Sequence, residues 1–168
     1  LDSKNKDITA SIRYAKRIQD AILLPDDLVR KYLPQTFILF KPKDIVSGDF
    51  YWIYHKKDIV LFAAVDCTGH GVPGAFMSIV GHNLLDKIVG EDGIIQPAAI
   101  LDELNKSVSD TLRQSNIEDQ AVKDGMDITL CAFDQQHHEL EFAGAFNPMF
   151  LVREKEIFEI KGNKFPIG

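Results

Sequence analysis

A run of seven apolar residues at positions 59–65 places the tightest limit on how this chain can fold. A short continuous run of this kind is typical of a strand that is buried on both faces of a sheet. The run ends at Asp66, and a glycine-rich turn follows, Cys67-Thr68-Gly69-His70-Gly71-Val72-Pro73-Gly74. Because proline is favoured in the first turn of a helix, a helix is predicted at about residues 73–89. The glycines let the backbone of this turn approach a metal ion or a phosphate closely.

A second motif, Ser47-Gly48-Asp49, opens the strand predicted at residues 47–54. If this strand pairs with the apolar one through a hairpin at residues 55–58, Asp49 and Asp66 meet at one edge of the sheet. Two carboxylates held close together repel each other unless a cation lies between them, and oxygen ligands suit Mg²⁺ or Mn²⁺. A plainer interpretation stays open, since an aspartate after glycine is commonly a turn residue and His70 is commonly structural or exposed.

The remaining patterns indicate a mixed α+β domain. Further helices are predicted at residues 1–23 and at about 97–115. Further short strands are predicted at 37–40, 127–133, 139–143, 149–153 and 156–160, with a polar loop at 116–125. Strands and helices that fall in blocks favour a layered α+β domain over a regularly alternating one. We therefore expect mostly antiparallel neighbours, with the two long helices on one face of the sheet.

The first helix carries a narrow apolar stripe, made of Ile8, Ile12, Ala15, Ile18 and Ile22. One interpretation is that the stripe packs on the helix's own domain; a second, compatible one is that it continues a coiled coil from an upstream module. A partly exposed stripe also favours a homodimer through this helix. We therefore expect a linker or signalling helix at residues 1–23 and the main domain at residues 34–168.

The composition narrows the class of protein. A net charge of −6 argues against a nucleic-acid partner and against binding to an anionic membrane. Two cysteines are too few for a disulfide framework, so a reduced, cytoplasmic compartment is expected. No signal peptide opens the sequence, and no apolar run approaches the ~20 residues needed to cross a bilayer. We expect the chain to be a fragment of a longer protein, in which an upstream region could tether the protein to a membrane.

Two stretches of the sequence resemble a known family. These are Lys43-Asp44-Ile45-Val46-Ser47-Gly48-Asp49-Phe50-Tyr51 and Val65-Asp66-Cys67-Thr68-Gly69-His70-Gly71-Val72-Pro73-Gly74-Ala75. They are similar to the SpoIIE-type phosphatases, the bacterial branch of the metal-dependent, protein phosphatase 2C-like (PPM) superfamily. Residues 124–130, 142–148 and 165–168 agree, and residues 11–19 resemble the linker helix that precedes such domains in signalling proteins. The resemblance covers nearly the whole chain.

The resemblance implies an α+β fold of the αββα sandwich type, with a two-metal centre that holds Mn²⁺ or Mg²⁺. Asp49 and Asp66 match the catalytic metal ligands, and the backbone carbonyl of Cys67 matches a further ligand. His70 is a candidate donor of a proton to the leaving serine or threonine oxygen. Asp124 or Asp127 is a candidate ligand for a weaker extra metal ion, although Asp127 could equally be a strand-edge residue that bonds the nearby turn.

The function that the resemblance implies is hydrolysis of phosphoserine or phosphothreonine on a partner protein by a metal-activated water. In bacterial signalling the family analogy points to a phosphorylated anti-sigma-factor antagonist as the substrate. It also points to an upstream sensor domain that acts through residues 1–23.

One departure from the family pattern bears on activity. Family members continue into a strand with Ser-Asp-Gly and later reach an Asp-Asp or Asp-Asn pair before a threonine. No Ser-Asp-Gly occurs in these 168 residues, which end before the place of the later pair. We therefore expect a fold that is truncated at its C-terminus, a loosely held metal ion and a weak or inactive enzyme. The alternative is a catalytically silent phosphatase fold that serves for binding or dimerisation. An unrelated Mg²⁺-dependent phosphoryl-transfer enzyme is disfavoured, because no Gly-x-x-x-x-Gly-Lys loop is present.

Overall fold

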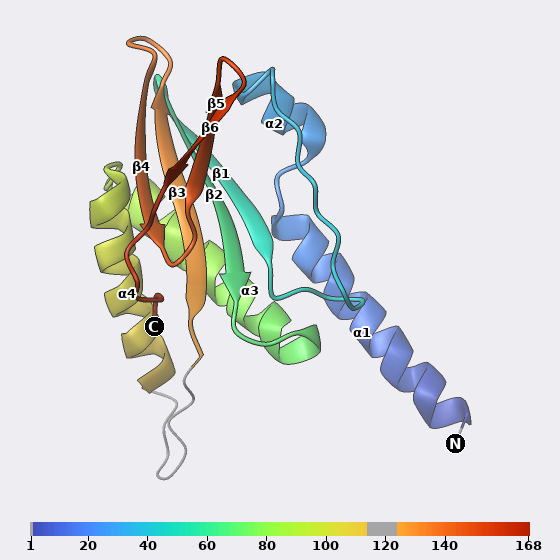
Figure 1. The fold of residues 1–168 in the computed structure, drawn as a ribbon. Coiled ribbons are helices and arrows are strands. Elements are labelled where there is room, and N and C mark those ends of the chain that lie inside the picture. The colour runs from blue at the N-terminus through green and yellow to red at the C-terminus, as the bar shows by residue number, and fades with distance from the viewer. Residues whose placement is uncertain (1, 114–123) are drawn as a thin grey trace.

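The chain folds around a four-stranded antiparallel sheet (Figure 1). In the computed structural model, which describes residues 2–113 and 124–168, the strands follow one another in sequence order across the sheet. They are β1 (Phe50–Lys56), β2 (Ile59–Cys67), β3 (Met126–Asp134) and β4 (Glu139–Ala145). Tight hairpins connect β1 to β2 and β3 to β4. The antiparallel arrangement predicted from the sequence is thus confirmed.

Two long helices cover one face of this sheet (Figure 1). They are α3 (Gly71–Asp86), which continues as the π-helical turn η1 (Lys87–Glu91), and α4 (Pro97–Arg113). The core lies between them and the sheet, where every second strand residue is buried, as expected for a strand with one face on the core. Its largest fully buried side chains include Phe50, Trp52, Leu61, Leu85, Ile88, Ile100, Leu104, Met126, Ile128 and Leu130. The predicted one-sided helical layer is confirmed.

A second, smaller β layer lies over the other face of the sheet. It is an antiparallel ribbon of β5 (Met149–Arg153) and β6 (Glu156–Ile160). The Thr129 hydroxyl donates a hydrogen bond to the Pro148 carbonyl (3.1 Å), and the Cys131 sulfur lies 3.6 Å from that of Met149. Of the αββα sandwich, residues 2–113 and 124–168 therefore form one helical layer, the main sheet and this ribbon.

The strand predicted at residues 37–40 is wrong. In the structure this segment pairs with no other strand of the described part of the chain. It runs across the outer face of the sheet, where the ring of Phe40 meets that of Tyr51 edge-on at 5.9 Å. The alternation of apolar residues that suggested a strand arises because Phe37 and Leu39 face solvent while Ile38 and Phe40 face the sheet.

Other element boundaries also differ from the sequence prediction. A short helix, α2 (Asp26–Tyr32), was not predicted, and α3 begins two residues earlier than expected, within the glycine-rich turn. Most of the polar loop predicted at residues 116–125 lies outside the described residues.

The first helix, α1 (Asp2–Ile22), contacts the domain mainly through its C-terminal half, and its N-terminal half projects away (Figure 1). Ile8, Tyr14 and Ile18 are exposed. Among the side chains of this helix whose burial is described, the buried one is Gln19, which is only 2% exposed. No helix in the described part of the chain is long and apolar enough to cross a membrane. The coiled-coil, homodimer and domain-boundary expectations stay predictions.

Three glycines let the loop before β1 and the turn after β2 pack backbone against backbone. A Cβ atom added at Gly48 would lie 2.6 Å from the Gly69 carbonyl oxygen, and one added at Gly74 would lie 2.6 Å from the same oxygen. Gly69 itself has φ +88°, a left-handed conformation that glycine adopts without strain. This contact fixes the start of β1 against the end of β2, which is the edge that carries Asp49 and Asp66.

We predict that Gly74→Ala destabilises the fold by about 2 kcal/mol, because the added methyl group meets a backbone oxygen that cannot move aside. Gly81→Ala in the same helix is the matched control. There the nearest atom is the Cε of Met126 at 3.0 Å, the end of a flexible side chain. Urea unfolding followed by circular dichroism should show the larger loss for Gly74→Ala; equal losses would contradict the backbone contact.

His82 on α3 is a buried imidazole at the junction of α1, α3 and β1. Its side chain is 11% exposed, and its Nδ1 has no hydrogen-bond partner in the described residues. Burial lowers the pKa of His82, and this effect outweighs the charge of Asp86 and a hydrogen bond to the Ile22 backbone, which both raise it. Below its ordinary pKa of 6.5 the unfolded chain therefore binds more protons at this position than the folded one does.

We predict that this difference makes the protein less stable as the pH falls below 6.5, and that His82→Gln flattens this dependence. The measurement is the free energy of unfolding in urea between about pH 7.5 and about pH 5.5, the window in which histidine titrates. His137→Gln is the control of opposite sign, because the hydrogen bond that the His137 ring donates to Asp134 raises the pKa of His137. Removing His137 should make the free energy of unfolding fall more steeply with decreasing pH. Slopes equal to that of wild type in both variants would contradict the roles given to His82 and His137.

Candidate functional site

Asp49 and Asp66 lie side by side at one edge of the main sheet. Phe50 pairs with Val65 in the register of β1 and β2, so the residue before Phe50 and the residue after Val65 face each other. Val65 and Cys67 are buried beneath the helices, so alternation along the strand puts Asp66 on the opposite, outer face. The structure thus brings together the two carboxylates that the hairpin was expected to join, while their role stays a prediction.

The carboxyl group of Asp49 holds its proton more tightly than an ordinary aspartate does. The pKa of Asp49 is raised to about 6, first by burial, then by a hydrogen bond with Asp66 and by the charge of Asp66. Within residues 2–113 and 124–168, none of the ion pairs involves either side chain. Two carboxyl groups without a cationic side chain nearby favour a cation or a proton between them.

Asp127 extends this row of carboxylates by one strand. It pairs directly with Asp66 in the register of β2 and β3. Burial, and then the charge of Asp66, raise the pKa of Asp127. Asp124 lies before the strand, where its carbonyl oxygen packs against Gly168. Of the two candidates, Asp127 is therefore the one that lies next to Asp66.

The alternative role for Asp127, bonding a nearby turn, finds no support in the described residues. The neighbouring turn is instead held by Thr68, whose backbone N–H and hydroxyl both bond to the Gly125 carbonyl (2.9 and 3.1 Å). Ile167 then pairs with Met126 through two backbone hydrogen bonds of 2.8 and 2.9 Å. The carboxylate of Asp127 is left without a hydrogen bond to the described part of the chain.

Cys67 offers its backbone rather than its thiol. The side chain is buried, and burial, followed by the charges of Asp66 and Asp49, raises the pKa of the thiol to about 12. At that pKa the sulfur is neutral and unreactive at ordinary pH. The Cys67 carbonyl lies beside the loop that carries Asp49, since a Cβ atom on Gly48 would be 3.1 Å from it.

His70 forms a pair with Asp44 just before the start of α3. Its Nδ1 lies 2.8 Å from a carboxylate oxygen of Asp44, and both side chains are well exposed. Because an ionised carboxylate can only accept, this bond places a proton on Nδ1 and leaves Nε2 open in the neutral ring. Asp44 lies in the first of the two motifs but was not among the predicted site residues.

Gln19 is a second residue near the site that sequence reasoning missed. Its side chain holds the backbone of Ser47, and the Ser47 hydroxyl accepts a hydrogen bond from the Asp49 N–H (3.1 Å). A signal was present in the sequence. The strict alternation of steps of four and three runs through positions 8, 12, 15, 19 and 22, so Gln19 is a polar residue in a position where the stripe demands an apolar one.

The donor atoms fit part of a divalent metal site. All are oxygens, from two neighbouring carboxylates, a backbone carbonyl and Asp127 one strand away, as Mg²⁺ and Mn²⁺ prefer. No group of three or more His, Cys, Asp or Glu side chains among the described residues is gathered tightly enough to hold a metal ion by itself. The set is therefore suited to a metal ion in chemistry and short of a full set of side-chain ligands.

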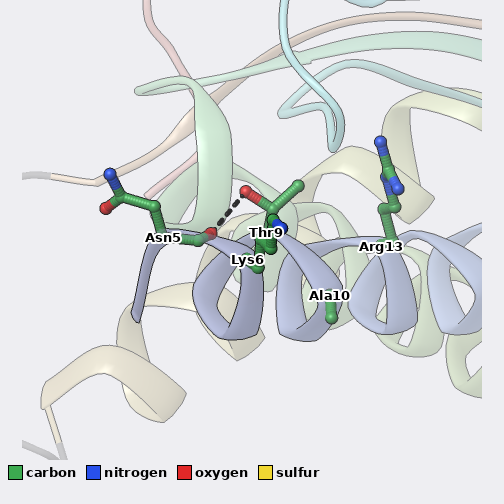
Figure 2. A pocket seen from close by; sticks show the side chains of 5 residues that line it. All are labelled: Asn5, Lys6, Thr9, Ala10 and Arg13. Carbon is green, nitrogen blue, oxygen red and sulfur yellow. Dashed lines mark hydrogen bonds between the residues drawn. The ribbon is translucent and has the colours of Figure 1, made fainter. Parts of the chain in front are cut away.

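A separate surface pocket lies on the projecting half of α1 (Figure 2). Figure 2 shows that its lining residues all come from this one helix: Asn5, Lys6, Thr9, Ala10 and Arg13. The bond drawn there joins the Thr9 hydroxyl to the Asn5 carbonyl, one turn away. Because no other element of the described chain contributes a group, the pocket is a groove of the helix surface and not part of the site.

The chain is similar to solved phosphatase structures. It is 37% identical to the SiaA-PP2C domain of Pseudomonas aeruginosa, with a TM-score of 0.86, over 100% of this chain and 65% of that domain. At 14% identity it matches a stage II sporulation E family protein from Thermanaerovibrio acidaminovorans (TM-score 0.53, 66% of this chain and 52% of that one). A structure from a study of the bacterial stressosome matches at 16% identity (TM-score 0.54, 75% and 58%). These last two matches concern the fold alone.

No curated protein sequence matches the chain. The family model of stage II sporulation protein E (SpoIIE) matches residues 56–168, which is more than half of the sequence. That region contains Asp66, the glycine-rich turn and Asp127, and phosphatases of this kind are typically metal-dependent. The chain belongs to the SpoIIE family of protein phosphatase 2C-like (PPM) phosphatase domains.

Proposed function

We propose that this chain is the greater part of a metal-dependent protein serine/threonine phosphatase domain, acting in a bacterial signalling protein. The observation that carries the proposal is the meeting of Asp49 and Asp66 at one end of the sheet, where burial and the neighbouring carboxylate raise the pKa of Asp49. A divalent cation binds such a pair readily, because its charge removes the repulsion between the carboxylates and any proton on them is released to water. Membership of the SpoIIE family supports the same reaction class.

In this proposal Asp49, Asp66 and the Cys67 carbonyl hold Mn²⁺ or Mg²⁺, and Asp127 joins them for a further ion. The metal ions, when bound, activate water for attack on phosphorus and neutralise charge on the phosphate. The outer face of the sheet leaves these carboxylates open to solvent beside a cavity of about 660 Å³, lined by residues 36–41 and by both aspartates. A phosphorylated side chain of another protein can therefore reach them.

His70 acts as the proton donor in this proposal. Asp44 holds its Nδ1–H, which fixes the ring and makes Nε2 the atom that takes up and returns a proton. The proton goes to the serine or threonine oxygen as it leaves phosphorus. The exposure of the pair suits a group that meets a protein substrate.

The partners follow from the same proposal. By family analogy the substrate is a phosphorylated anti-sigma-factor antagonist or a similar switching protein, and a sensor acts through α1. The exposed apolar residues of α1 suit such a helical contact or a homodimer. Because the chain spans 65% of the SiaA-PP2C domain, these functions belong to the whole protein.

A second candidate is a catalytically silent phosphatase fold that serves as a binding or dimerising module. The observation that favours it is the incomplete cluster, since the described residues gather fewer than three metal-ligating side chains at one point. The two candidates differ in whether the full-length protein binds a divalent metal ion and hydrolyses a phosphate ester.

We predict that the full-length protein hydrolyses a small aryl phosphate only with Mn²⁺ or Mg²⁺, and that Asp66→Asn abolishes this activity. The 168-residue chain should be much weaker. Asp134→Asn is the matched control, because Asp134 lies in the same sheet but at the opposite end of the strands, where it pairs with Ile59. A full-length protein with neither Mn²⁺ binding nor hydrolysis would establish the silent module instead.

We also predict that Asp127→Asn weakens Mn²⁺ binding by roughly 10-fold, the low end of the range for losing a group around a metal site. Asp124→Asn should leave the affinity unchanged, because Asp124 lies outside the row of paired strand residues. Isothermal titration calorimetry on both variants of the full-length protein gives the comparison. The reverse order of effects would assign the extra ligand to Asp124.

A further inference from the structure

Gln19 is a buried polar side chain on a helix whose other described side chains are exposed or half-buried. It is 2% exposed, and its amide lies between α3 and the loop before β1. Burying an amide is unfavourable unless its hydrogen bonds are made. A buried glutamine at a stripe position therefore indicates specific partners that an apolar residue could not serve.

Both ends of the Gln19 amide bond to one backbone segment. Nε2 donates to the Ser47 carbonyl at 2.6 Å and to the Ser78 hydroxyl at 2.7 Å, while Oε1 accepts the Ser47 N–H at 3.0 Å. The side chain thus imitates a neighbouring strand, because it satisfies the donor and the acceptor of the same residue. Ser47 is itself buried, so without Gln19 both of its backbone groups would be left unpaired away from water.

The same segment carries Asp49. The Ser47 hydroxyl accepts the Asp49 N–H at 3.1 Å, and Gly48 between them is packed against the turn after β2. A continuous path of hydrogen bonds therefore leads from α1 through Ser47 to the backbone of Asp49. Ser78 lies on a separate branch, since its hydroxyl donates to the Ala75 carbonyl within α3 at 2.8 Å.

We propose that Gln19 is a positioning residue for the Asp49/Asp66 pair, and that it makes the seating of α1 on the domain a condition for an ordered metal site. The proposal rests on the function proposed above. Any partner that draws α1 away from α3 removes the amide from Ser47 and frees the loop that presents Asp49. The N-terminal half of α1, which projects from the domain, is where such a partner has access (Figure 1).

A purely structural role predicts something different. If Gln19 only fastened α1 to α3, cutting either branch of its hydrogen bonds would have the same effect on the metal site. If it positions Asp49, only the Ser47 branch matters. Ser78→Ala cuts the α3 branch and leaves both bonds to Ser47 in place, so it is the matched control for Gln19→Ala.

The test is Mn²⁺ binding by isothermal titration calorimetry to the full-length protein, its Gln19→Ala and Ser78→Ala variants, with amide hydrogen exchange on the same samples. We expect Gln19→Ala to raise the Mn²⁺ dissociation constant by at least roughly 10-fold, as for loss of an outer-shell partner. We expect faster exchange at Ser47 and Asp49, with the β2–β3 amides unchanged. Ser78→Ala should leave the Mn²⁺ dissociation constant close to that of wild type, because both bonds of Gln19 to Ser47 remain.

Ser47→Ala gives an independent check, because it keeps both backbone bonds to Gln19 and removes only the hydroxyl that accepts the Asp49 N–H. Ser47→Ala should weaken Mn²⁺ binding. The Gln19→Ala/Ser47→Ala double variant should lose less binding free energy than the sum of the two single losses, as expected for residues on one path. Additive losses would overturn the proposal.

Two further outcomes separate this proposal from the one it rests on. A wild-type protein that binds Mn²⁺, with Gln19→Ala binding equally well, overturns the role of Gln19 alone. Equal weakening by Gln19→Ala and Ser78→Ala also overturns it, in favour of simple helix docking. A wild-type protein that binds no Mn²⁺ contradicts the metal site itself, and the positioning role falls with it.

Discussion

The pairing of β1 with β2 is the constraint on which the rest of the site depends. Phe50 opposite Val65 puts Asp49 beside Asp66, and the alternation of the strand sends both carboxylates to the face away from the helices. A shift of one residue in this register would turn Asp66 toward the core and expose Val65. The apolar layer under α3 and α4 therefore fixes the register, and the register fixes the chemistry at the sheet edge. The geometry of the site therefore depends on the packing of the core.

Much of this arrangement could be predicted from the sequence, because it follows from local patterns. The apolar run at residues 59–65, the two aspartates at strand ends and the glycine turn were sufficient to place Asp49 next to Asp66. The segment at residues 37–40 was assigned wrongly, since alternation of apolar residues does not show whether a segment pairs beside a sheet or crosses its face. The break that Gln19 makes in the helix stripe is visible in the sequence, but its partners are 28 and 59 residues away in the chain, so no pattern within the helix could name them.

The site is stabilised by backbone groups as much as by side chains. Gly48 and Gly74 close around the Gly69 carbonyl, Thr68 bonds to Gly125, and Gln19 bonds both backbone groups of Ser47. These contacts hold in place two carboxylates whose mutual repulsion works against the fold. Catalytic and binding sites commonly retain such unfavourable groups, and the surrounding structure compensates for them. In this chain the compensation comes from the glycine contact and from the buried amide.

The backbone contact between the glycines has a consequence for how such proteins diverge. An interface made from main-chain atoms leaves the identity of most neighbouring side chains free, but it admits no side chain at its own positions. The fold is retained at 14% identity in the Thermanaerovibrio acidaminovorans protein. Sequence drift in this family is therefore expected to be large in the helices and the outer ribbon, and nearly absent at positions 48 and 74. A short glycine–aspartate motif is then the part of the sequence that is expected to stay recognisable in the most distant relatives.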